Sequence, residues 1–514
     1  MRPQFGAWLC GVVTSAWLFG PATGDTFDPA PTLAPSSLPR IGTIDERFQS
    51  YNIEMVEVTG GWFWKPYRSA PGRPTRPPGS ARDQPPAKHD THLLQYRPPL
   101  DLGNSRLRKL AAALGPAYLR VSGTWANSTY FAASEHAPSA PPSGFGGILT
   151  HQQWRDVVNF SQAVDAPIIT SFAVSAGARD AKGVWTSDQA ARLIDFTAAI
   201  GGRITAAEFM NEPDLPAIGG APKHYSTTQY ASDFRIFLAF VKQAAPGLQI
   251  LGPGTIGADA IPAELLAGAG RALSAVSFHS YGGLSKRCHG GLTPEGALSE
   301  EWLSRSQRAL DYYIGLRDRF APGKPIWLTE TAQAACGGDA WAASFLDTFR
   351  YLDQLGRMAK SGVQVVIHNT LAASDYGLLD ETDLRPRPNY WAAWLWRQLM
   401  GATVLDAGLP IQSGLRVYAH CLRGAPGGIA LLVINPDRDV SHALRLPGTW
   451  LRYRLDADRL TDQQTRLNGT ALALTANDEL PPMTGLPTAA DELRFPPVSI
   501  TFLAMAEAGN QSCR

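Results

Sequence analysis

The sequence predicts an α/β fold in which a (β/α)8 TIM barrel is followed by a C-terminal β-sandwich. From about residue 50, eight short apolar segments alternate with helical patterns, as expected of parallel strands that are covered on both faces. After Gly401 the long helical patterns stop, and short strand-like segments alternate with turns rich in Gly, Pro, Asn and Asp. A doubly wound open sheet is the rival fold, but Thr59-Gly60-Gly61 does not fit the phosphate loop that such sheets carry after their first strand.

The elements can be placed by residue number. We expect barrel strands at 51–58, 117–122, 167–172, 204–210, 248–252, 274–279, 325–329 and 363–368. We expect helices at 104–114, 151–164, 187–201, 227–244, 262–270, 299–320, 340–361 and 389–400. Further strands, those of the sandwich, are expected at Arg416–Cys421, Gly428–Asn435, Ala443–Leu446, Leu451–Leu455, Ala471–Thr475 and Val498–Ala506.

These elements divide the chain into a barrel at 48–400 and a sandwich at 401–514. An extended, Pro- and Ser-rich segment at 25–47 is expected to pack on the sandwich. Residues Trp62–Pro99 interrupt the first barrel unit. Because they follow a barrel strand, they are expected either to shape the active-site rim or to form a solvated loop.

Composition describes a globular protein without a global charge bias. Hydrophobic residues make up 44% of the 514 residues, and the formal net charge of +1 excludes broad attraction to nucleic acid. Residues 1–24 have the basic start, apolar stretch and small-residue end of a secretory signal. A membrane anchor is the alternative, but the apolar stretch is short for a span. We therefore expect a monomer that is secreted, extracellular or periplasmic, and not inserted in a membrane.

The cysteine count agrees with export. Cys10 lies in the expected signal, which leaves Cys288, Cys336, Cys421 and Cys513. An even number in an exported chain favours two disulfides, for which three pairings exist. Free buried thiols are the alternative.

Two glutamates follow apolar runs: Glu212 after the predicted fourth strand and Glu330 at the end of the predicted seventh. Parallel barrel strands deliver both side chains to one rim, where two carboxylates across a sugar bond are what a glycosidase needs. Carboxyls about 5 Å apart predict retention of configuration. Glu212 is the better candidate for the acid and Glu330 for the nucleophile, while Glu208 lies deeper in the barrel. A single strand-end glutamate would more simply be a structural ion pair.

Three neighbours fit this chemistry. Asn211 can bind a sugar hydroxyl beside Glu212, and Tyr281 can donate a hydrogen bond that keeps Glu330 ionised. His279 could be a metal ligand, but the sequence has no cluster of His, Asp and Glu at metal spacing, so a hydrogen-bonding or packed histidine is expected. We expect no metal and no cofactor.

The chain also resembles the heparanases of glycoside hydrolase family 79, in the retaining clan A barrels. The resemblance runs from about residue 40 to the C-terminus. It is carried by Ala117–Thr124, Asn211-Glu212-Pro213, His279-Ser280-Tyr281, Trp327–Thr331, Tyr376–Glu381, Asn389-Tyr390-Trp391, Leu415–Cys421 and Leu480–Met483.

The resemblance implies that Glu212 is the acid/base and Glu330 the nucleophile. It implies that a turn and a tyrosine grip the glucuronate carboxylate and that two further residues lie near the sugar hydroxyls. The positions that match are Cys336, Gly337, Gly338 and Tyr376 for the carboxylate, and Thr124 and Glu54 for the hydroxyls. It also pairs Cys421 with Cys513, which leaves Cys288 with Cys336.

The resemblance implies a retaining endo-β-glucuronidase that cleaves internal bonds of a glucuronic-acid-containing polysaccharide of the heparan sulfate type. One alternative is an exo-β-glucuronidase that acts on terminal glucuronides or hyaluronan fragments. A second alternative is an inactive carbohydrate-binding barrel, against which the presence of both glutamates counts.

Overall fold

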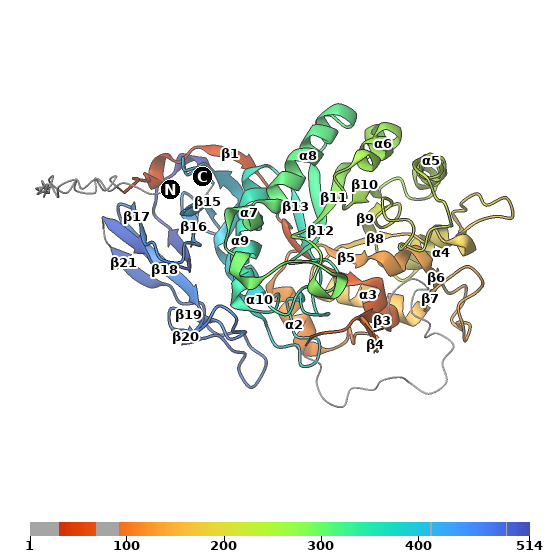
Figure 1. Cartoon of the computed structure of the whole chain (residues 1–514), viewed down its shortest axis with the longest axis horizontal. Coiled ribbons are helices and arrows are strands. Elements are labelled where there is room, and N and C mark those ends of the chain that lie inside the picture. The colour runs from red at the N-terminus through yellow and green to blue at the C-terminus, as the bar shows by residue number, and fades with distance from the viewer. Residues whose placement is uncertain (1–29, 68–91, 412–413, 490) are drawn as a thin grey trace, which may run out of the picture.

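The computed structural model describes residues 30–67, 92–411, 414–489 and 491–514. The expected signal at 1–24 and much of the Trp62–Pro99 insertion therefore lie outside the described residues. Figure 1 shows a barrel ringed by helices, with an antiparallel sheet region beside it that holds both ends of the described chain. In the described part of the chain, no helix has the length and apolar character to cross a membrane.

Eight parallel strands form a closed barrel in the order β10-β11-β12-β13-β2-β5-β8-β9. Their bounds are β2 (Gln49–Glu54), β5 (Leu119–Ser122), β8 (Ile168–Ser171), β9 (Ile204–Glu208), β10 (Gln249–Thr255), β11 (Ala275–Tyr281), β12 (Ile326–Ala332) and β13 (Val365–His368). The predicted TIM barrel is confirmed. Apolar side chains early in the strands, including Tyr118 and Trp327 with ring centroids 5.2 Å apart, fill the interior, so polar residues further along the strands lie above a packed floor.

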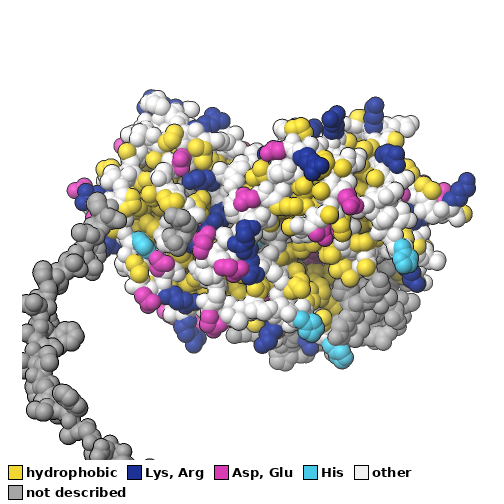
Figure 2. Space-filling view, turned by 45° about the horizontal axis from the view of Figure 1, so that its top comes forward, with side chains coloured by type: hydrophobic (Ala, Val, Ile, Leu, Met, Phe, Trp, Pro, Cys, Tyr) yellow, Lys and Arg dark blue, Asp and Glu magenta, His cyan; other side chains and the backbone are white. Residues whose placement is uncertain are grey.

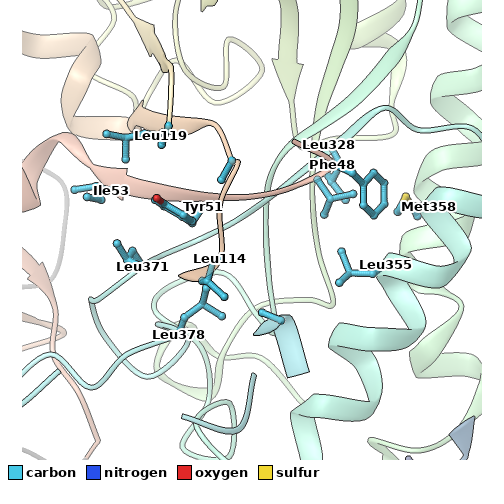
Figure 3. Close-up of a cluster of buried hydrophobic side chains, with 14 of the residues drawn as sticks. Phe48, Tyr51, Ile53, Leu114, Leu119, Leu328, Leu355, Met358, Leu371 and Leu378 are labelled. Carbon is cyan, nitrogen blue, oxygen red and sulfur yellow. The ribbon is translucent and has the colours of Figure 1, made fainter. Parts of the chain in front are cut away.

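Helices cover the outside of the barrel (Figure 1). Their bounds are α2 (Ser105–Ala113), α3 (His151–Ala163), α4 (Asp188–Ala199), α5 (Thr227–Ala244), α6 (Ala260–Ala269), α7 (Glu300–Leu303), α8 (Arg305–Phe320), α9 (Phe345–Lys360) and α10 (Pro388–Leu399). The starts follow local sequence: Thr150 and Ser226 form capping boxes that satisfy the first turns of α3 and α5. The core lies between helices and strands, and Figure 3 shows Phe48 grouped with Leu328, Leu355 and Met358.

Short elements form the rim above the barrel. They are α1 (Met55–Thr59), β3 (Gly61–Trp64), β4 (Leu94–Arg97), η2 (Thr124–Ser128), β6 (Thr129–Phe131), β7 (Gly147–Leu149), η3 (Ala176–Ala178), η5 (Lys286–Cys288) and η6 (Pro294–Gly296). At the opposite end of the barrel, η4 (Gly270–Ala272) connects α6 to β11. The predicted strand at 51–58 is wrong beyond Glu54, because a capping box between Glu54 and Glu57 starts a helix there. The ends of the insertion pair as a β3–β4 hairpin.

The C-terminal region is antiparallel, as predicted. A nine-stranded sheet contains β1 (Arg40–Thr43), β14 (Met400–Leu405), β15 (Arg416–Leu422), β16 (Ile429–Asn435), β18 (Thr449–Asp456), β19 (Arg466–Leu467), β20 (Thr470–Ala471), β21 (Leu486–Ala489) and β23 (Ser499–Met505). The antiparallel pair β17 (His442–Arg445) and β22 (Glu492–Phe495) packs over one face of it. The short helices η1 (Pro35–Ser37) and η7 (Gln511–Cys513) lie near the two ends of the described chain. The second layer of the sandwich, the pair β17 and β22, is therefore much smaller than the nine-stranded sheet.

Three local predictions need correction. The predicted strand at 471–475 is only the end of β20, because Leu472 and the following residues run on without a strand partner in the described chain. The predicted helix at 299–320 is two helices, α7 and α8, separated at Ser304. The predicted helix at 340–361 begins only at Phe345, because residues 333–344 form turns above β12.

Candidate active site

Glu212 and Glu330 meet at one rim of the barrel. Glu330 lies in β12, and Glu212 lies four residues after Glu208, the last residue of β9. One carboxylate oxygen from each, together with a ring nitrogen of His279, lie within 4.8 Å of one another. Both glutamates are buried, with 8% and 5% of their surface exposed. The structure therefore brings Glu212 and Glu330 together, as expected from their positions at the ends of barrel strands.

Three donors surround Glu330. The Tyr281 hydroxyl donates to Oε1 at 2.5 Å, and the Arg120 guanidinium donates to Oε2 at 2.7 Å. His279 Nδ1 lies 3.9 Å from Oε2. Burial alone would raise the pKa of Glu330, but the charges of His279 and Arg120 and the hydrogen bond from Tyr281 outweigh it, and the pKa is lowered. Glu330 is therefore an ionised carboxylate.

Glu212 has a different setting. Its Oε1 lies 3.0 Å from His279 Nδ1, and its backbone has φ of 45°, a left-handed conformation that aims the side chain back over the barrel. Burial raises the pKa of Glu212, the charge of Glu330 raises it further, and the hydrogen bond with His279 opposes the rise. The net effect is a raised pKa, which favours a carboxyl that holds its proton.

Asn211 is fixed by two neighbours. Its backbone N–H donates to Asn127 Oδ1 at 2.8 Å, and its backbone carbonyl accepts from Asn127 Nδ2 at 2.8 Å. Its side-chain oxygen accepts from Arg120 at 2.8 Å. This arrangement leaves the Asn211 amide group beside Glu212 with a defined orientation.

Arg120 and Glu208 were not identified as site residues from the sequence. The Arg120 side chain is fully buried and joins Glu330, Glu208 and Asn211. Glu208 accepts further hydrogen bonds from Ser277 and Thr329, and its pKa is lowered because Arg120 and His279 overcome the effect of burial. Glu208 is thus a structural anion that holds Arg120 in place. The signal that could have identified Arg120 is a charged residue inside an otherwise apolar strand.

The carboxylates around His279 raise its pKa. Although burial lowers this pKa, the charge of Glu330, the nearby Glu208 carboxylate and the hydrogen bond with Glu212 raise it to about 10. The spacing of the three groups would admit a cation, since Glu212, His279 and Glu330 present ligand atoms within 4.8 Å. The Arg120 guanidinium already donates to Glu330 at 2.7 Å and lies 3.3 Å from His279 Nε2, so a cation is in place beside these groups and the donor set does not fit a metal ion.

Glu54, Tyr281 and Tyr376 lie around the side-chain amide of Asn369. Asn369 Nδ2 donates to Glu54 Oε1 at 3.1 Å and to the Tyr281 hydroxyl at 2.9 Å, and it lies 3.4 Å from the Tyr376 hydroxyl. Burial and the charge of Glu330 raise the pKa of Glu54 well above its ordinary value. Glu54 Oε2 lies against Gly123, where a side chain would clash, and Thr124 follows at the start of η2.

The Gly337–Gly338 turn faces the same region. Both glycines have positive φ, 80° and 78°, and a Cβ on Gly338 would lie 3.1 Å from the Tyr376 Cβ. Cys336, next to the turn, is bonded to Cys288 of η5, and Cys421 is bonded to Cys513 in the C-terminal region.

A closed barrel with two buried carboxylates at its strand ends defines a glycoside hydrolase. Comparison with known proteins agrees with this class. The family model "Glycosyl hydrolase family 79, N-terminal domain" matches residues 98–356, and this chain belongs to that family. The family resemblance seen in the sequence is confirmed.

Relatives extend the similarity over most of the chain. A heparanase of Mus musculus is 26% identical over 479 residues, 80% of this chain and 88% of that protein. A hyaluronoglucuronidase of Hirudo nipponia is 26% identical over 471 residues, 81% of this chain and 92% of that protein. A solved 4-O-α-L-rhamnosyl-β-D-glucuronidase of Fusarium oxysporum 12S shares the fold, with a TM-score of 0.62 and 14% identity over 93% of this chain and 99% of that one.

Proposed function

We propose that the protein is a retaining endo-β-glucuronidase that hydrolyses internal β-glucuronidic bonds of heparan sulfate-type glycosaminoglycans by double displacement. One observation carries the mechanism: oxygens of Glu212 and Glu330 lie within 4.8 Å of each other, with pKa values shifted in opposite directions. Carboxyl groups at this spacing leave no room for a water between nucleophile and sugar, which favours direct attack by a carboxylate.

In the first displacement, the Glu330 carboxylate attacks the anomeric carbon while the Glu212 carboxyl donates its proton to the departing oxygen. A glycosyl ester of Glu330 forms and the reducing-side fragment leaves. In the second, the Glu212 carboxylate takes a proton from water, the water oxygen bonds to the anomeric carbon, and Glu330 departs as a carboxylate. The sugar keeps its configuration, because the two attacks come from opposite faces.

The electrostatics support the change of role at Glu212. The charge of Glu330 helps to raise the pKa of Glu212 in the resting enzyme. That charge disappears when Glu330 becomes an ester, so the pKa of Glu212 falls and the carboxylate can act as a base. Arg120 and Tyr281 then stabilise Glu330 as it regains its charge in the second step.

We assign the glucuronate carboxylate to the Gly337–Gly338 turn and the Tyr376 hydroxyl. The Gly338 N–H donates to the Ala334 carbonyl at 3.1 Å, so we assign the Gly337 N–H as the backbone donor to the anion. Such a group suits an anion because it is fixed in advance and carries no net charge to desolvate. Asn211, Tyr281, Glu54 and Thr124 are assigned to the sugar hydroxyls. The named activities of the heparanase and hyaluronoglucuronidase relatives support a glucuronide substrate.

An exo-β-glucuronidase is the second candidate, and one observation favours it. Tyr67, from the insertion after the first barrel strand, meets Arg287, from the loop after β11, and Asp375, from the loop after β13. This contact joins three rim loops, which favours a cleft that is closed at that end. Figure 2 shows acidic and basic side chains intermingled on the visible face, with no continuous basic surface for a highly sulfated polymer.

We also propose that the chain is exported and acts as a monomer outside the cytoplasm. The two disulfides and the signal-like residues 1–24 support export. Mass analysis of protein recovered from the medium or periplasm tests this: a chain that begins near residue 25 is expected, and retention of residues 1–24 in a cell-bound protein would contradict it.

The enzyme assignment is tested with an aryl β-glucuronide and the Glu330→Gln variant. Wild-type turnover with loss in the variant is expected; equal inactivity of both, on the aryl glucuronide and on polymers, would leave the inactive carbohydrate-binding barrel. Gel filtration of heparan sulfate and hyaluronan digests then separates the two candidates. An early fall in chain length indicates endo-cleavage, and release of monosaccharide alone indicates exo-cleavage.

A further inference from the structure

Arg287 lies beside the Gly337–Gly338 turn and has no part in the assignments above. Its side chain is 7% exposed although it carries a charge. Its Nη2 donates to Asp375 Oδ2 at 2.6 Å, and its guanidinium carbon lies 4.3 Å from the centre of the Tyr67 ring. A Cβ built on Gly337 would lie 2.5 Å from Arg287 Nη1, so the guanidinium packs directly on the turn. Burying a charged side chain costs free energy, so the close packing of Arg287 against Gly337 indicates that Arg287 has a function at the turn.

The partners of Arg287 are the residues that hold the turn. The Gly337 carbonyl accepts from the Ser374 hydroxyl at 3.0 Å and from the Asp375 backbone N–H at 3.1 Å. Arg287 binds the Asp375 carboxylate and lies 3.4 Å from the Ser374 hydroxyl. Arg287 therefore contacts the side chains of both residues that bind the Gly337 carbonyl, and its loss should loosen the turn.

The loop that carries Arg287 is fastened to the turn at several points. The neighbouring Cys288 is bonded to Cys336, which precedes Gly337. The Lys286 backbone N–H donates to Asp339 at 2.7 Å, just beyond the turn. The guanidinium and the turn are therefore held as one unit, and the positive charge has a fixed position relative to the turn.

The charge of Arg287 also reaches the other half of the assigned carboxylate site. Burial raises the pKa of Tyr376 well above its ordinary value, and Arg287 opposes that rise. Arg287 is thus near both the Gly337–Gly338 turn and Tyr376. A sugar carboxylate between these groups would experience the positive charge, whereas a neutral hydroxymethyl group would gain little from it.

We propose that Arg287 is a positioning residue that selects an acidic sugar: it fixes the Gly337–Gly338 turn and provides the positive charge that favours a uronate over a neutral hexose. This inference rests on the proposed function, because it concerns the same sugar site. It adds a residue behind the turn that determines substrate specificity. It predicts that loss of Arg287 weakens the binding of charged sugars and leaves that of neutral sugars unchanged.

The chain offers a matched control. Arg179 is also 7% exposed, pairs with Asp233 at 2.7 Å, and lies over the Tyr225 ring at 5.1 Å. It holds the loop after β8 against α5 and does not contact the turn. A general loss of stability from removing a buried arginine should therefore appear in both Arg179→Gln and Arg287→Gln, whereas a change in sugar selectivity should appear only in Arg287→Gln.

The test measures kcat and KM of the full-length enzyme on an aryl β-glucuronide and on the matching aryl β-glucoside. Arg287→Gln should raise KM for the glucuronide by about 10- to 100-fold, the range for one charge-assisted interaction, and should change glucoside hydrolysis little. Arg287→Lys, which keeps the charge without the planar fork, should recover part of the loss. Arg179→Gln should melt at a lower temperature and keep the wild-type ratio of the two activities.

If Arg287→Gln does not fold, Arg287→Lys provides the answer: it keeps the charge but loses the planar fork that binds Asp375, so it should raise KM for the glucuronide by a smaller factor and leave the glucoside unaffected. A KM for the glucuronide that is unchanged in these variants, or equal losses on both substrates, would overturn the inference. A wild-type enzyme without activity on glucuronides would remove the proposed function itself. An active wild type with unaltered Arg287 variants would remove only this inference.

Discussion

The polar layer above the apolar barrel interior forms the floor of the active site. Buried carboxyl groups on the two sides of this floor differ in the direction in which their pKa values are shifted. On the side of Glu330, Arg120, His279 and Tyr281 converge on the carboxylate and hold its pKa below the usual range. On the side of β2 and α1, burial dominates: it raises the pKa of Glu54 well above its ordinary value and that of Glu57 to about 7. Residues of one type, all buried, thus have pKa values shifted in opposite directions.

The difference shows that burial alone does not decide the charge of these groups. Glu212 lies between the two sides: it shares His279 with Glu330, yet Arg120 is not among the main influences on its pKa, and burial leaves that pKa raised. A retaining glycosidase needs one ionised and one protonated carboxyl close together. The placement of two cations on one side of the floor meets this requirement.

Removal of the ionised carboxylate should have the largest effect. Glu330→Gln should lower kcat on an aryl β-glucuronide by about 10⁴-fold or more, since it removes the nucleophile. Asp233→Asn is the control, because Asp233 is also buried in an ion pair but lies away from the floor. Comparable losses in the two variants would mean that the Glu330 effect comes from misfolding.

Removal of the protonated carboxyl should depend on the leaving group. Glu212→Gln should cost about 10²- to 10⁴-fold on substrates with a poor leaving group, which must be protonated as it departs. Formation of the glycosyl ester from a strongly acidic phenol should be nearly unaffected, because that phenolate leaves without a proton. Pre-steady-state release of phenol measures this step. Equal losses with both leaving groups would contradict the assignment of Glu212 as the acid.

Glu57 tests the side where burial dominates. Its pKa of about 7 lies above its ordinary 4.5, so its contribution to stability is complete below pH 4.5 and is lost as the pH rises through 7. Relative to Glu57→Gln, which stays neutral, the wild type should lose about 3 kcal/mol of unfolding free energy between pH 4.5 and 8. Denaturant titrations of both proteins measure this difference. A constant difference across that range would show that Glu57 is ionised throughout.

The smallest effect should come from one hydrogen bond on the side of Glu330. Tyr281→Phe removes a donor that favours the ionised form, so the pKa of Glu330 should rise. The acid limb of the profile of kcat/KM against pH should therefore move to higher pH, by about one unit. Tyr313→Phe is the control, because Tyr313 is buried behind β11 and bonds to Thr255. An acid limb that does not move would show that Tyr281 leaves the pKa of Glu330 unaffected.

Much of the fold follows from local sequence. The eight strand positions were predicted from short apolar runs, and α5 begins and ends at the predicted residues 227 and 244. Ser226 caps its start, and Pro246 follows its end. The meeting of Glu212 and Glu330 follows from barrel geometry, since both come after such runs.

Contacts between residues far apart in sequence could not be derived from the sequence. Arg120 binds Glu208 and Glu330, which are 88 and 210 residues away, and no local pattern indicates either partner. The Arg287–Asp375 pair likewise joins loops from two different barrel units. The helix at Met55–Thr59 was predicted as part of a strand, because the capping box that starts it lies within an apolar run. In the two arginine clusters, side chains brought together by the closed barrel decide the outcome, whereas the short helix depends on a local contact between Glu54 and Glu57.

The central claim is that Glu330 attacks the sugar while Glu212 supplies the proton, and a trapped intermediate tests it most directly. A 2-deoxy-2-fluoro-glucuronyl fluoride should inactivate the enzyme and add one fluoroglucuronyl group, which peptide mass spectrometry should place on Glu330. An adduct on Glu212 or Glu54, or an active enzyme that never forms an adduct, would contradict the account.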